Sequence, residues 1–265
     1  MDRINSPHNE RVKRAIRLRS RAERDAEGMF LIEGGREARR ALEAGAGPVE
    51  AFFCPQFMAE SDRGLPELCA GLGARVAECS EPAFRKMAYG EHHGGILLVA
   101  PQVRKTLEAL TQPGNPLLLV AVAVEKPGNL GALIRSADAA GAAAVIACDG
   151  ATDAFNPHAI RASTGLVFSM PVVETSTSEL IPWLRKRGLK ILAATPHADM
   201  DYTRADLRNG LAIAVGAEDR GLSDTWLMAA DIRVRIPMRG KADSLNVSAA
   251  ASVLLFEAAR QRHAP

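Results

Sequence analysis

The stretch LLLVAVAVEKPGNLGALIRSADAAGA, residues 117–142, decides the fold class. It begins with an uninterrupted apolar run, Leu117–Val124, which predicts a strand buried on both faces. Proline, glycine and asparagine follow, and a helical pattern completes the stretch. A tight turn from a buried strand into a helix leaves backbone N–H groups facing the crevice beyond the strand end, where α/β proteins commonly bind ligands. Gly128 and Gly131 are spaced G-x-x-G, which disfavours a dinucleotide-binding loop and with it a nicotinamide-dependent oxidoreductase.

Apolar runs continue the alternation of strands and helices toward the C-terminus. They predict a mostly parallel sheet, because strands covered on both faces read as near-continuous apolar runs. A terminal helix is predicted over Ser244–Arg260, with Ser244 as its N-cap. The candidate strands are Leu117–Val124, Ala144–Cys148, Lys190–Ala194, Leu211–Val215 and Ile232–Ile236.

The N-terminal half shows a weaker alternation of the same kind. Short strand-like and helical runs between Phe30 and Val99 predict a smaller α/β unit. Several prolines around a charged stretch predict a connector after it. We therefore expect a first domain over residues 1–100, a linker over 101–116 and a second domain over 117–265.

Composition restricts the class of protein. A chain of 265 residues with 47% hydrophobic content can build two modest domains. The longest apolar run is far shorter than the roughly 18 residues that a membrane span needs. Because the N-terminus also lacks the apolar centre of a secretory signal, we expect a cytoplasmic protein. Four scattered cysteines predict free buried thiols, and the adjacent His92 and His93 are expected in a loop without a metal.

Positive charge gathers near the N-terminus, although the net charge is only +2. Residues 11–24 contain seven Lys or Arg against a single acid. In one continuous helix Arg14, Arg17, Arg21 and Arg24 would share a face, which favours contact with a polyanion. A merely solvated face is the alternative interpretation.

Two further segments place polar residues near the ends of strands. In LAIAVGAEDRGLS, residues 211–223, a buried strand ends in glycine and Glu218 follows. In RIPMRGKADSLNVSAAASVLLFE, residues 235–257, Asn246 lies near the start of the terminal helix. Arg135 falls about one turn after the glycine turn, where a long cationic side chain could reach back to the crevice. Spacing alone leaves a surface ion pair equally open for Arg135.

Three segments together resemble a known family. NLGALIRSADAAGA, VGAEDRGLS and IPMRGKADSLNVSAAASVLLFE are similar to the three ordered motifs of the SpoU (TrmH) branch of the SPOUT methyltransferases, and they span most of residues 117–260. The first domain, with FLIEGGREARRALEAG and HHGGILLV, resembles more loosely an L30e-like substrate-binding domain. The resemblance implies an α/β protein whose C-terminal SPOUT domain, with a mostly parallel sheet, contains a deep trefoil knot. It also implies S-adenosyl-L-methionine as cofactor and no metal.

The resemblance implies roles for particular residues. Arg135 would be the central catalytic residue; because a guanidinium stays protonated, we expect it to stabilise developing alkoxide charge and to hold a neighbouring phosphate. Asn129, Glu218, Ser244 and Asn246 would support it. The cofactor would contact Thr195, Gly216, Ile236, Met238 and Leu245, while Arg14, Arg17, Arg21 and Arg161 would contact RNA.

The expected activity is transfer of a methyl group to a ribose 2′-oxygen of a structured RNA. A leading domain gives reach into a large folded substrate, so ribosomal RNA of the 23S type is favoured over transfer RNA. The family also implies a homodimer, with the knot region and the terminal helix at its interface, and no membrane. A non-catalytic RNA-binding or ribosome-assembly protein on the same fold is the alternative, although every polar residue of the motifs is present.

Overall fold

A computed structural model describes residues 2–89, 94–110, 114–150 and 152–263 and separates them into two compact units. Unit 1 comprises Met1–Val103 and Phe155–Ser169, and unit 2 comprises Arg104–Ala154 and Met170–Pro265. Residues 155–169 thus pack into unit 1 although unit 2 flanks them in the sequence, an excursion that the predicted domain limits did not foresee. The predicted loop with His92 and His93 lies outside the described residues.

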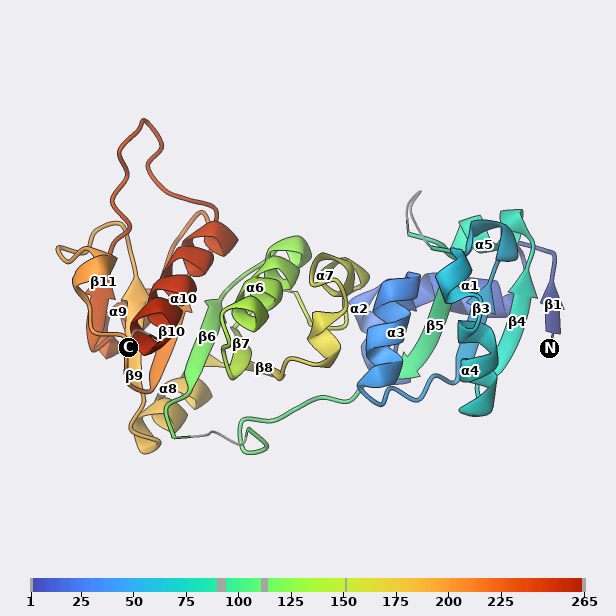
Figure 1. Cartoon of the computed structure of the whole chain (residues 1–265), viewed down its shortest axis with the longest axis horizontal. Helices are drawn as coiled ribbons and strands as arrows, with labels where there is room; N and C mark the ends of the chain where they lie inside the picture. The colour runs from blue at the N-terminus through green and yellow to red at the C-terminus, as the bar shows by residue number, and fades with distance from the viewer. Residues whose placement is uncertain (1, 90–93, 111–113, 151, 264–265) are drawn as a thin grey trace. The chain divides into compact units, whose positions relative to one another are not determined.

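Unit 1 is built on a five-stranded sheet in the order β1-β4-β3-β5-β2 (Figure 1). Strands β1, β4 and β3 are parallel, whereas β5 runs antiparallel to both β3 and β2. The short β1 was not predicted. The strands are β1 (Asp2–Ile4), β2 (Met29–Glu33), β3 (Glu50–Phe53), β4 (Arg75–Cys79) and β5 (Ile96–Pro101).

Helices cover both faces of this sheet. Val12 of α1 and Phe84 of α5 pack with Phe52 on one face. On the other face α3 and α4 pack with Phe30, and Ile160 of α7 joins the same cluster. The helices of unit 1 are α1 (Glu10–Arg17), α2 (Arg21–Glu27), α3 (Gly35–Glu43), α4 (Leu65–Gly71), α5 (Glu81–Met87) and α7 (Pro157–Ala162). Single turns of 3₁₀ helix span Pro55–Phe57, Glu60–Asp62 and Leu166–Phe168.

The expected continuous basic helix at the N-terminus is wrong, because the chain breaks it into α1 and α2. Asn9 caps α1 by accepting a hydrogen bond from the backbone N–H of Arg11, and Ser20 precedes α2 in an extended conformation. Arg24 is fully buried and donates to the carbonyl oxygen of Arg19. The four arginines therefore do not form one exposed stripe.

Unit 2 is built on a six-stranded sheet in the order β11-β9-β10-β6-β7-β8. All its strand pairings are parallel, which confirms the predicted parallel sheet. Strand β8 was not predicted, and β6 and β11 end two residues earlier than expected. The strands are β6 (Leu117–Val122), β7 (Ala144–Cys148), β8 (Val172–Thr175), β9 (Lys190–Ala194), β10 (Leu211–Val215) and β11 (Ile232–Val234).

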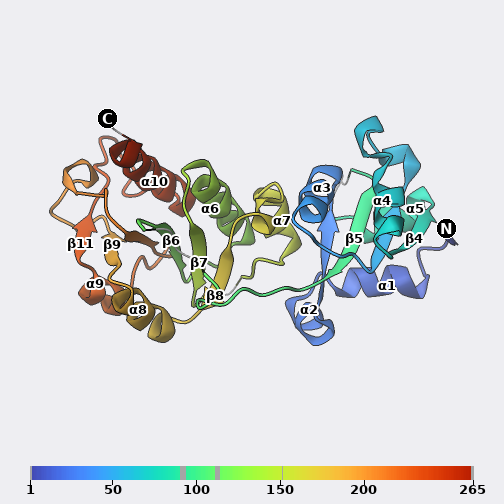
Figure 2. The same cartoon turned by 60° about the horizontal axis from the view of Figure 1, so that its bottom comes forward.

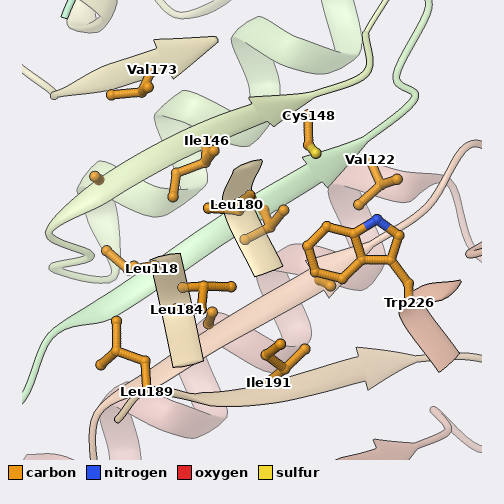
Figure 3. Packing of buried hydrophobic residues seen from close by; sticks show 14 of the residues in the cluster. Leu118, Val122, Ile146, Cys148, Val173, Leu180, Leu184, Leu189, Ile191 and Trp226 are labelled. Atoms are coloured by element: carbon orange, nitrogen blue, oxygen red, sulfur yellow. The ribbon is translucent and has the colours of Figure 1, made fainter. Parts of the chain in front are cut away.

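Two pairs of helices enclose this sheet (Figure 2). Leu180 and Leu184 of α8 and Trp226 of α9 pack against the side chains of the central strands on one face (Figure 3). On the other face α6 and α10 lie side by side, joined by a 2.8 Å hydrogen bond between the Oγ atoms of Ser136 and Ser252. The helices are α6 (Pro127–Ala139), α8 (Thr177–Lys186), α9 (Asp224–Ala229) and α10 (Val247–His263), with a 3₁₀ turn at Tyr202–Arg204.

The predicted cap of the terminal helix is also wrong. Helix α10 begins at Val247, three residues after Ser244. The Oδ1 atom of Asn246 accepts a 3.0 Å hydrogen bond from the backbone N–H of Ser248, so Asn246 caps the helix instead. The four cysteines are buried free thiols, as predicted. Within the described residues no helix has both the length and the apolar character to cross a membrane.

Candidate active site

A pocket opens at the carboxyl ends of the neighbouring strands β6 and β10. Parallel pairing of these two strands brings the loops that follow them to the same edge of the sheet. The start of α10 closes the third side. The pocket has a volume of about 230 Å³, and its lining residues are Val124, Glu125, Lys126, Asn129, Ala217, Glu218, Asp219 and Val247.

Glu218 is the centre of a hydrogen-bond network at this pocket. Its Oε2 atom lies 2.8 Å from the Nζ of Lys126. Its Oε1 atom accepts a 3.2 Å hydrogen bond from the Nδ2 of Asn129 and another from the Nδ2 of Asn246. Three segments far apart in the sequence therefore meet on one carboxylate.

The orientation of Asn246 is fixed from its other end. Its Oδ1 accepts hydrogen bonds from the backbone N–H and the Oγ of Ser248, at 3.0 and 2.5 Å. The amide nitrogen must then point toward Glu218. Hydrogen bonding and charge from Lys126, followed by the two asparagine amides, hold the pKa of Glu218 below its usual value. Glu218 is therefore ionised near neutral pH and is a weak proton acceptor.

Next to the pocket, the backbone of Gly216 lies very close to the backbone of Gly221. A Cβ atom at this position would lie 2.1 Å from the carbonyl carbon of Gly221, so no other residue fits without moving the backbone. The carbonyl oxygen of Ala217 accepts a 2.9 Å hydrogen bond from the N–H of Gly221 and closes the turn. The glycine thus allows the loop to fold back and present Glu218 to the pocket.

The other predicted catalytic residues lie outside this network. Arg135 is exposed on α6, and its side chain forms no hydrogen bond or ion pair with any described residue. Ser244 is exposed in the loop before α10 and likewise makes no side-chain hydrogen bond to a described residue. The structure thus brings together Asn129, Glu218 and Asn246. The catalytic roles of all five stay predictions.

Three of the predicted cofactor residues follow neighbouring strands. Thr195, Gly216 and Ile236 come directly after or close to the ends of β9, β10 and β11, which are adjacent and parallel. The backbone N–H of Thr195 donates a 2.9 Å hydrogen bond to Val234. All three residues therefore lie at the same edge of the sheet, while their cofactor contacts stay predictions.

The segment from Ile236 to Leu245 offers backbone groups to a ligand. The backbone N–H groups of Ile236, Met238 and Leu245 make no hydrogen bond to any described residue, and the first two residues are half-buried. Polar backbone groups at a partly buried site require a partner. Free backbone donors and acceptors fit the edge of an adenine ring, so these residues suit S-adenosyl-L-methionine.

The predicted RNA-binding arginines already have acidic neighbours within the chain. The Nε of Arg14 lies 2.7 Å from Glu27, while its Nη1 lies 3.1 Å from Glu50. Arg17 and Arg21 form longer ion pairs with acids of α2, at 3.8 and 3.6 Å. Arg161 belongs to unit 1, where its Nη1 lies 4.0 Å from Glu33. Their contacts with RNA stay predictions.

Sequence reasoning missed Lys126. The residue precedes Asn129 by three positions, between the end of β6 and the pocket, and its ion pair with Glu218 joins two of the motifs. Its position at the strand-to-helix turn was the available signal. Because a lysine at such a turn is common on protein surfaces, the sequence offered no reason to select it.

Comparison with known families agrees with this geometry. The model of the SpoU rRNA Methylase family matches residues 116–256, which contain every residue of the pocket. The chain belongs to the SpoU rRNA methylase family. A second model, the MRM3-like substrate binding domain, matches residues 9–98 within unit 1. The predicted family and the two-domain α/β fold are confirmed.

Several known methyltransferases are similar to nearly the whole chain. The 23S rRNA (guanosine(2553)-2′-O)-methyltransferase RlmP of Bacillus subtilis (strain 168) is 31% identical over 257 residues, which are 97% of this chain and 98% of RlmP. A crystal structure of an RNA 2′-O ribose methyltransferase is 44% identical, with a TM-score of 0.87 over 98% of this chain and 99% of that one. An AdoMet-bound rRNA methyltransferase from Sinorhizobium meliloti is 29% identical, with a TM-score of 0.88 over 98% and 97% of the two chains.

Proposed function

We propose that this SpoU-family chain is an S-adenosyl-L-methionine-dependent methyltransferase that modifies a ribose 2′-oxygen of 23S ribosomal RNA. The observation that carries the proposal is the meeting of Asn129, Glu218 and Asn246, one from each motif, at a pocket on the carboxyl edge of the parallel sheet. The full-length relative RlmP, by its name, methylates a 2′-oxygen of 23S rRNA.

Cofactor binding falls to the loops at this edge of the sheet. When bound, S-adenosyl-L-methionine supplies an electrophilic methyl group. Backbone groups of Ile236, Met238 and Leu245 would hold it, with Thr195 and Gly216 at the neighbouring strand ends. No metal is needed, because methyl transfer from a sulfonium to a hydroxyl requires alignment of the reactants above all.

The remaining polar residues act on the acceptor. The guanidinium of Arg135 stays protonated, so we assign it to stabilising negative charge on the ribose 2′-oxygen and to holding an adjacent phosphate. Asn129 and Asn246, oriented by Glu218, would align the ribose, with Ser244 nearby in the sequence. Because the pKa of Glu218 is held low, we assign that carboxylate to orientation and not to removing the hydroxyl proton.

Unit 1 would select the RNA through its backbone and shape, with Arg14, Arg17, Arg21 and Arg161 as the candidate contacts. The named activity of a full-length relative favours ribosomal RNA over transfer RNA. A ribosomal RNA substrate would also place the protein in the cytoplasm.

We also propose that the enzyme is a homodimer. Phe256 on α10 is 51% exposed, and the small residues Ala249 and Ala250 lie two turns before it on the same helix. Such a surface suits a symmetric helix interface. Sedimentation at assay concentrations should give a dimer; a stable, active monomer would contradict the proposal.

The deciding experiment maps 2′-O-methyl groups in RNA from cells with and without this protein. We expect one 23S rRNA site to lose its methyl group without it, and purified enzyme to restore that group with tritiated cofactor. Methylation of transfer RNA alone would replace the substrate assignment. Absence of S-adenosylhomocysteine binding by calorimetry, together with tight RNA binding, would favour the non-catalytic alternative.

A further inference from the structure

Lys126 is the cation among the charged residues that line the pocket. Its Nζ lies 2.8 Å from the Oε2 of Glu218, and the two side chains are 73% and 31% exposed. Glu125 and Asp219 line the same pocket and share Arg220 as their ion-pair partner, so Lys126 is the cation that pairs with Glu218. The backbone N–H of Asn129 donates a 3.0 Å hydrogen bond to the carbonyl oxygen of Lys126, but the ammonium of Lys126 bonds to neither asparagine side chain among the described residues. The charge of Lys126 therefore acts on the two amides through Glu218.

The two asparagine amides depend on the charged form of Glu218. An ionised carboxylate only accepts hydrogen bonds, whereas a protonated one carries a donor. Glu218 Oε1 accepts from the Nδ2 atoms of both Asn129 and Asn246. The Oδ1 of Asn246 accepts hydrogen bonds from Ser248. The amide therefore cannot flip to accept a hydrogen bond from a protonated Glu218 without losing the helix cap.

Fixing both Nδ2 atoms on Glu218 leaves one acceptor in the network weakly used. From the described residues, the Oδ1 of Asn129 receives only a 3.4 Å hydrogen bond from the Nδ2 of Asn246. An incoming hydroxyl group can donate to this oxygen. The orientation of the hydroxyl group that receives the methyl group thus follows from the charge on Glu218.

We propose that Lys126 is a positioning residue, whose ion pair holds the ionised carboxylate of Glu218 in the orientation that fixes the amides of Asn129 and Asn246. Its effect on turnover rests on the proposed function, whereas its effect on Glu218 does not. The charged groups near Glu218 are Glu125 and Lys126 from the turn before α6, and Asp219 and Arg220 from its own loop. The amides of Asn129 and Asn246 face it from α6 and from the start of α10.

The first test follows the titration of Glu218 directly by carboxyl carbon NMR, with the signal assigned by Glu218→Gln. We expect Lys126→Met to raise the pKa of Glu218, because this variant removes the cation that lowers it most, and Lys126→Arg to keep it low. Lys126→Gln provides a second neutral variant if Lys126→Met does not fold. An unchanged Glu218 pKa in a folded neutral variant would overturn the proposal.

Arg220→Met is the matched control. Arg220 lies 3.0 Å from Asp219 and 3.1 Å from Glu125, so this variant removes a cation near the pocket without touching Glu218. We expect it to leave the titration of Glu218 and the activity unchanged. An equal rise of the Glu218 pKa in Lys126→Met and Arg220→Met would show that the pKa depends on the net surface charge around the pocket. That result would contradict a specific role for Lys126.

The second test separates positioning from RNA binding by steady-state kinetics. We expect Lys126→Met to lower kcat about fivefold at pH 8, the size of effect typical of an exposed ion pair, with the KM for RNA unchanged. The effect should deepen at lower pH, because a higher Glu218 pKa makes the carboxylate protonate sooner as the pH falls. Lys126→Arg should restore both values.

A change in the KM for RNA without a change in kcat would indicate that Lys126 contacts an RNA phosphate. A raised KM for RNA with a weaker salt dependence, an unchanged kcat and an unchanged Glu218 pKa would overturn the positioning role. If the wild-type protein transferred no methyl group to any RNA, the proposed function would fail. The NMR titration would still decide the role of Lys126.

Discussion

Glu50 in unit 1 and Glu218 in unit 2 are both carboxylates on which distant segments converge. Glu50 accepts from the Nε of Arg11 at 2.5 Å and from the Nη1 of Arg14 at 3.1 Å, and it is only 7% exposed. Glu218 binds Lys126 and two asparagine amides at the rim of a pocket. A closed cluster of this kind stabilises the fold, whereas an open one remains accessible to a substrate.

The largest effect should come from the open cluster and its pocket. Arg135→Ala should lower kcat by about a hundredfold or more, because the variant removes a donor to developing oxygen charge. Its exposed side chain has no intramolecular partner among the described residues, so stability and affinity for S-adenosylhomocysteine should stay unchanged. Tritium transfer to RNA and calorimetry measure the two quantities.

Arg135→Lys is the sharper companion variant. It keeps the charge but removes the forked donor geometry, so we expect it to remain strongly impaired. Full activity in Arg135→Ala would remove this residue from the mechanism.

Breaking the closed cluster should affect stability instead. Glu50→Ala should lower the free energy of unfolding by about 2 kcal/mol, because it removes a buried carboxylate from two partly buried arginines that keep only Asp2 and Glu27 as acidic partners among the described residues. Urea denaturation measures this change. Glu10→Gln, at an ion pair whose carboxylate is 81% exposed, should change stability by less than about 0.5 kcal/mol. Similar values for the two variants would show that Glu50 stabilises the fold no more than an exposed ion pair does, and would refute the stabilising role of the closed cluster.

The turn that presents Glu218 should tolerate no side chain. Gly216→Ala should lower kcat/KM by at least about tenfold, since a small displacement at a reacting site is costly and the new Cβ would collide with the backbone of Gly221. Gly71→Ala is the control, because its Cβ would meet no atom within 4 Å. Wild-type activity in Gly216→Ala would show that the turn can move without harming the site.

The smallest effects are expected from the N-terminal arginines. Arg17 and Arg21 form loose, exposed ion pairs at 3.8 and 3.6 Å, so they can exchange their partners for phosphates. The double variant Arg17→Gln, Arg21→Gln should weaken RNA binding a few-fold and reduce the salt slope by about 1 for each phosphate that is no longer neutralised. Arg14→Gln should reduce the slope less, because Glu27 and Glu50 already neutralise much of that guanidinium's charge. Equal slopes in all variants would exclude these arginines from RNA binding.

The strands of unit 2 other than β8 could be predicted because they contain apolar runs, whereas β8 has a single buried residue, Val173. The missed elements depend on signals of other kinds. Strand β1 has only three residues and exists through its pairing with β4, far away in the sequence. Helix α8 carries a capping box from Ser176 to Glu179, which the sequence displays. The break between α1 and α2 lies at Ser20, whose extended backbone interrupts the helical pattern of the arginines although its side chain makes no cap hydrogen bond.

The site was predictable only in part. Strand ends indicated where a ligand could bind, but only the resemblance to a family joined Asn129, Glu218 and Asn246 into one site. Ser244 was mistaken for a cap, because a serine before a helical pattern is an ordinary start signal and Asn246 lies just beyond it. Lys126 could not be selected, since its role depends on a loop more than 90 positions away.

The excursion of residues 155–169 bears on how the polypeptide responds to cleavage. The ring of Phe155 lies 4.8 Å from that of Phe30, and the Nη1 of Arg40 donates a 2.6 Å hydrogen bond to the carbonyl oxygen of Thr164. A protease that nicks the chain between residues 104 and 110 would therefore yield two fragments that still co-migrate under native conditions. Because the chain passes between unit 1 and unit 2 three times, separating the units requires three cuts. A fragment made by a single stop codon will therefore lack part of one hydrophobic core.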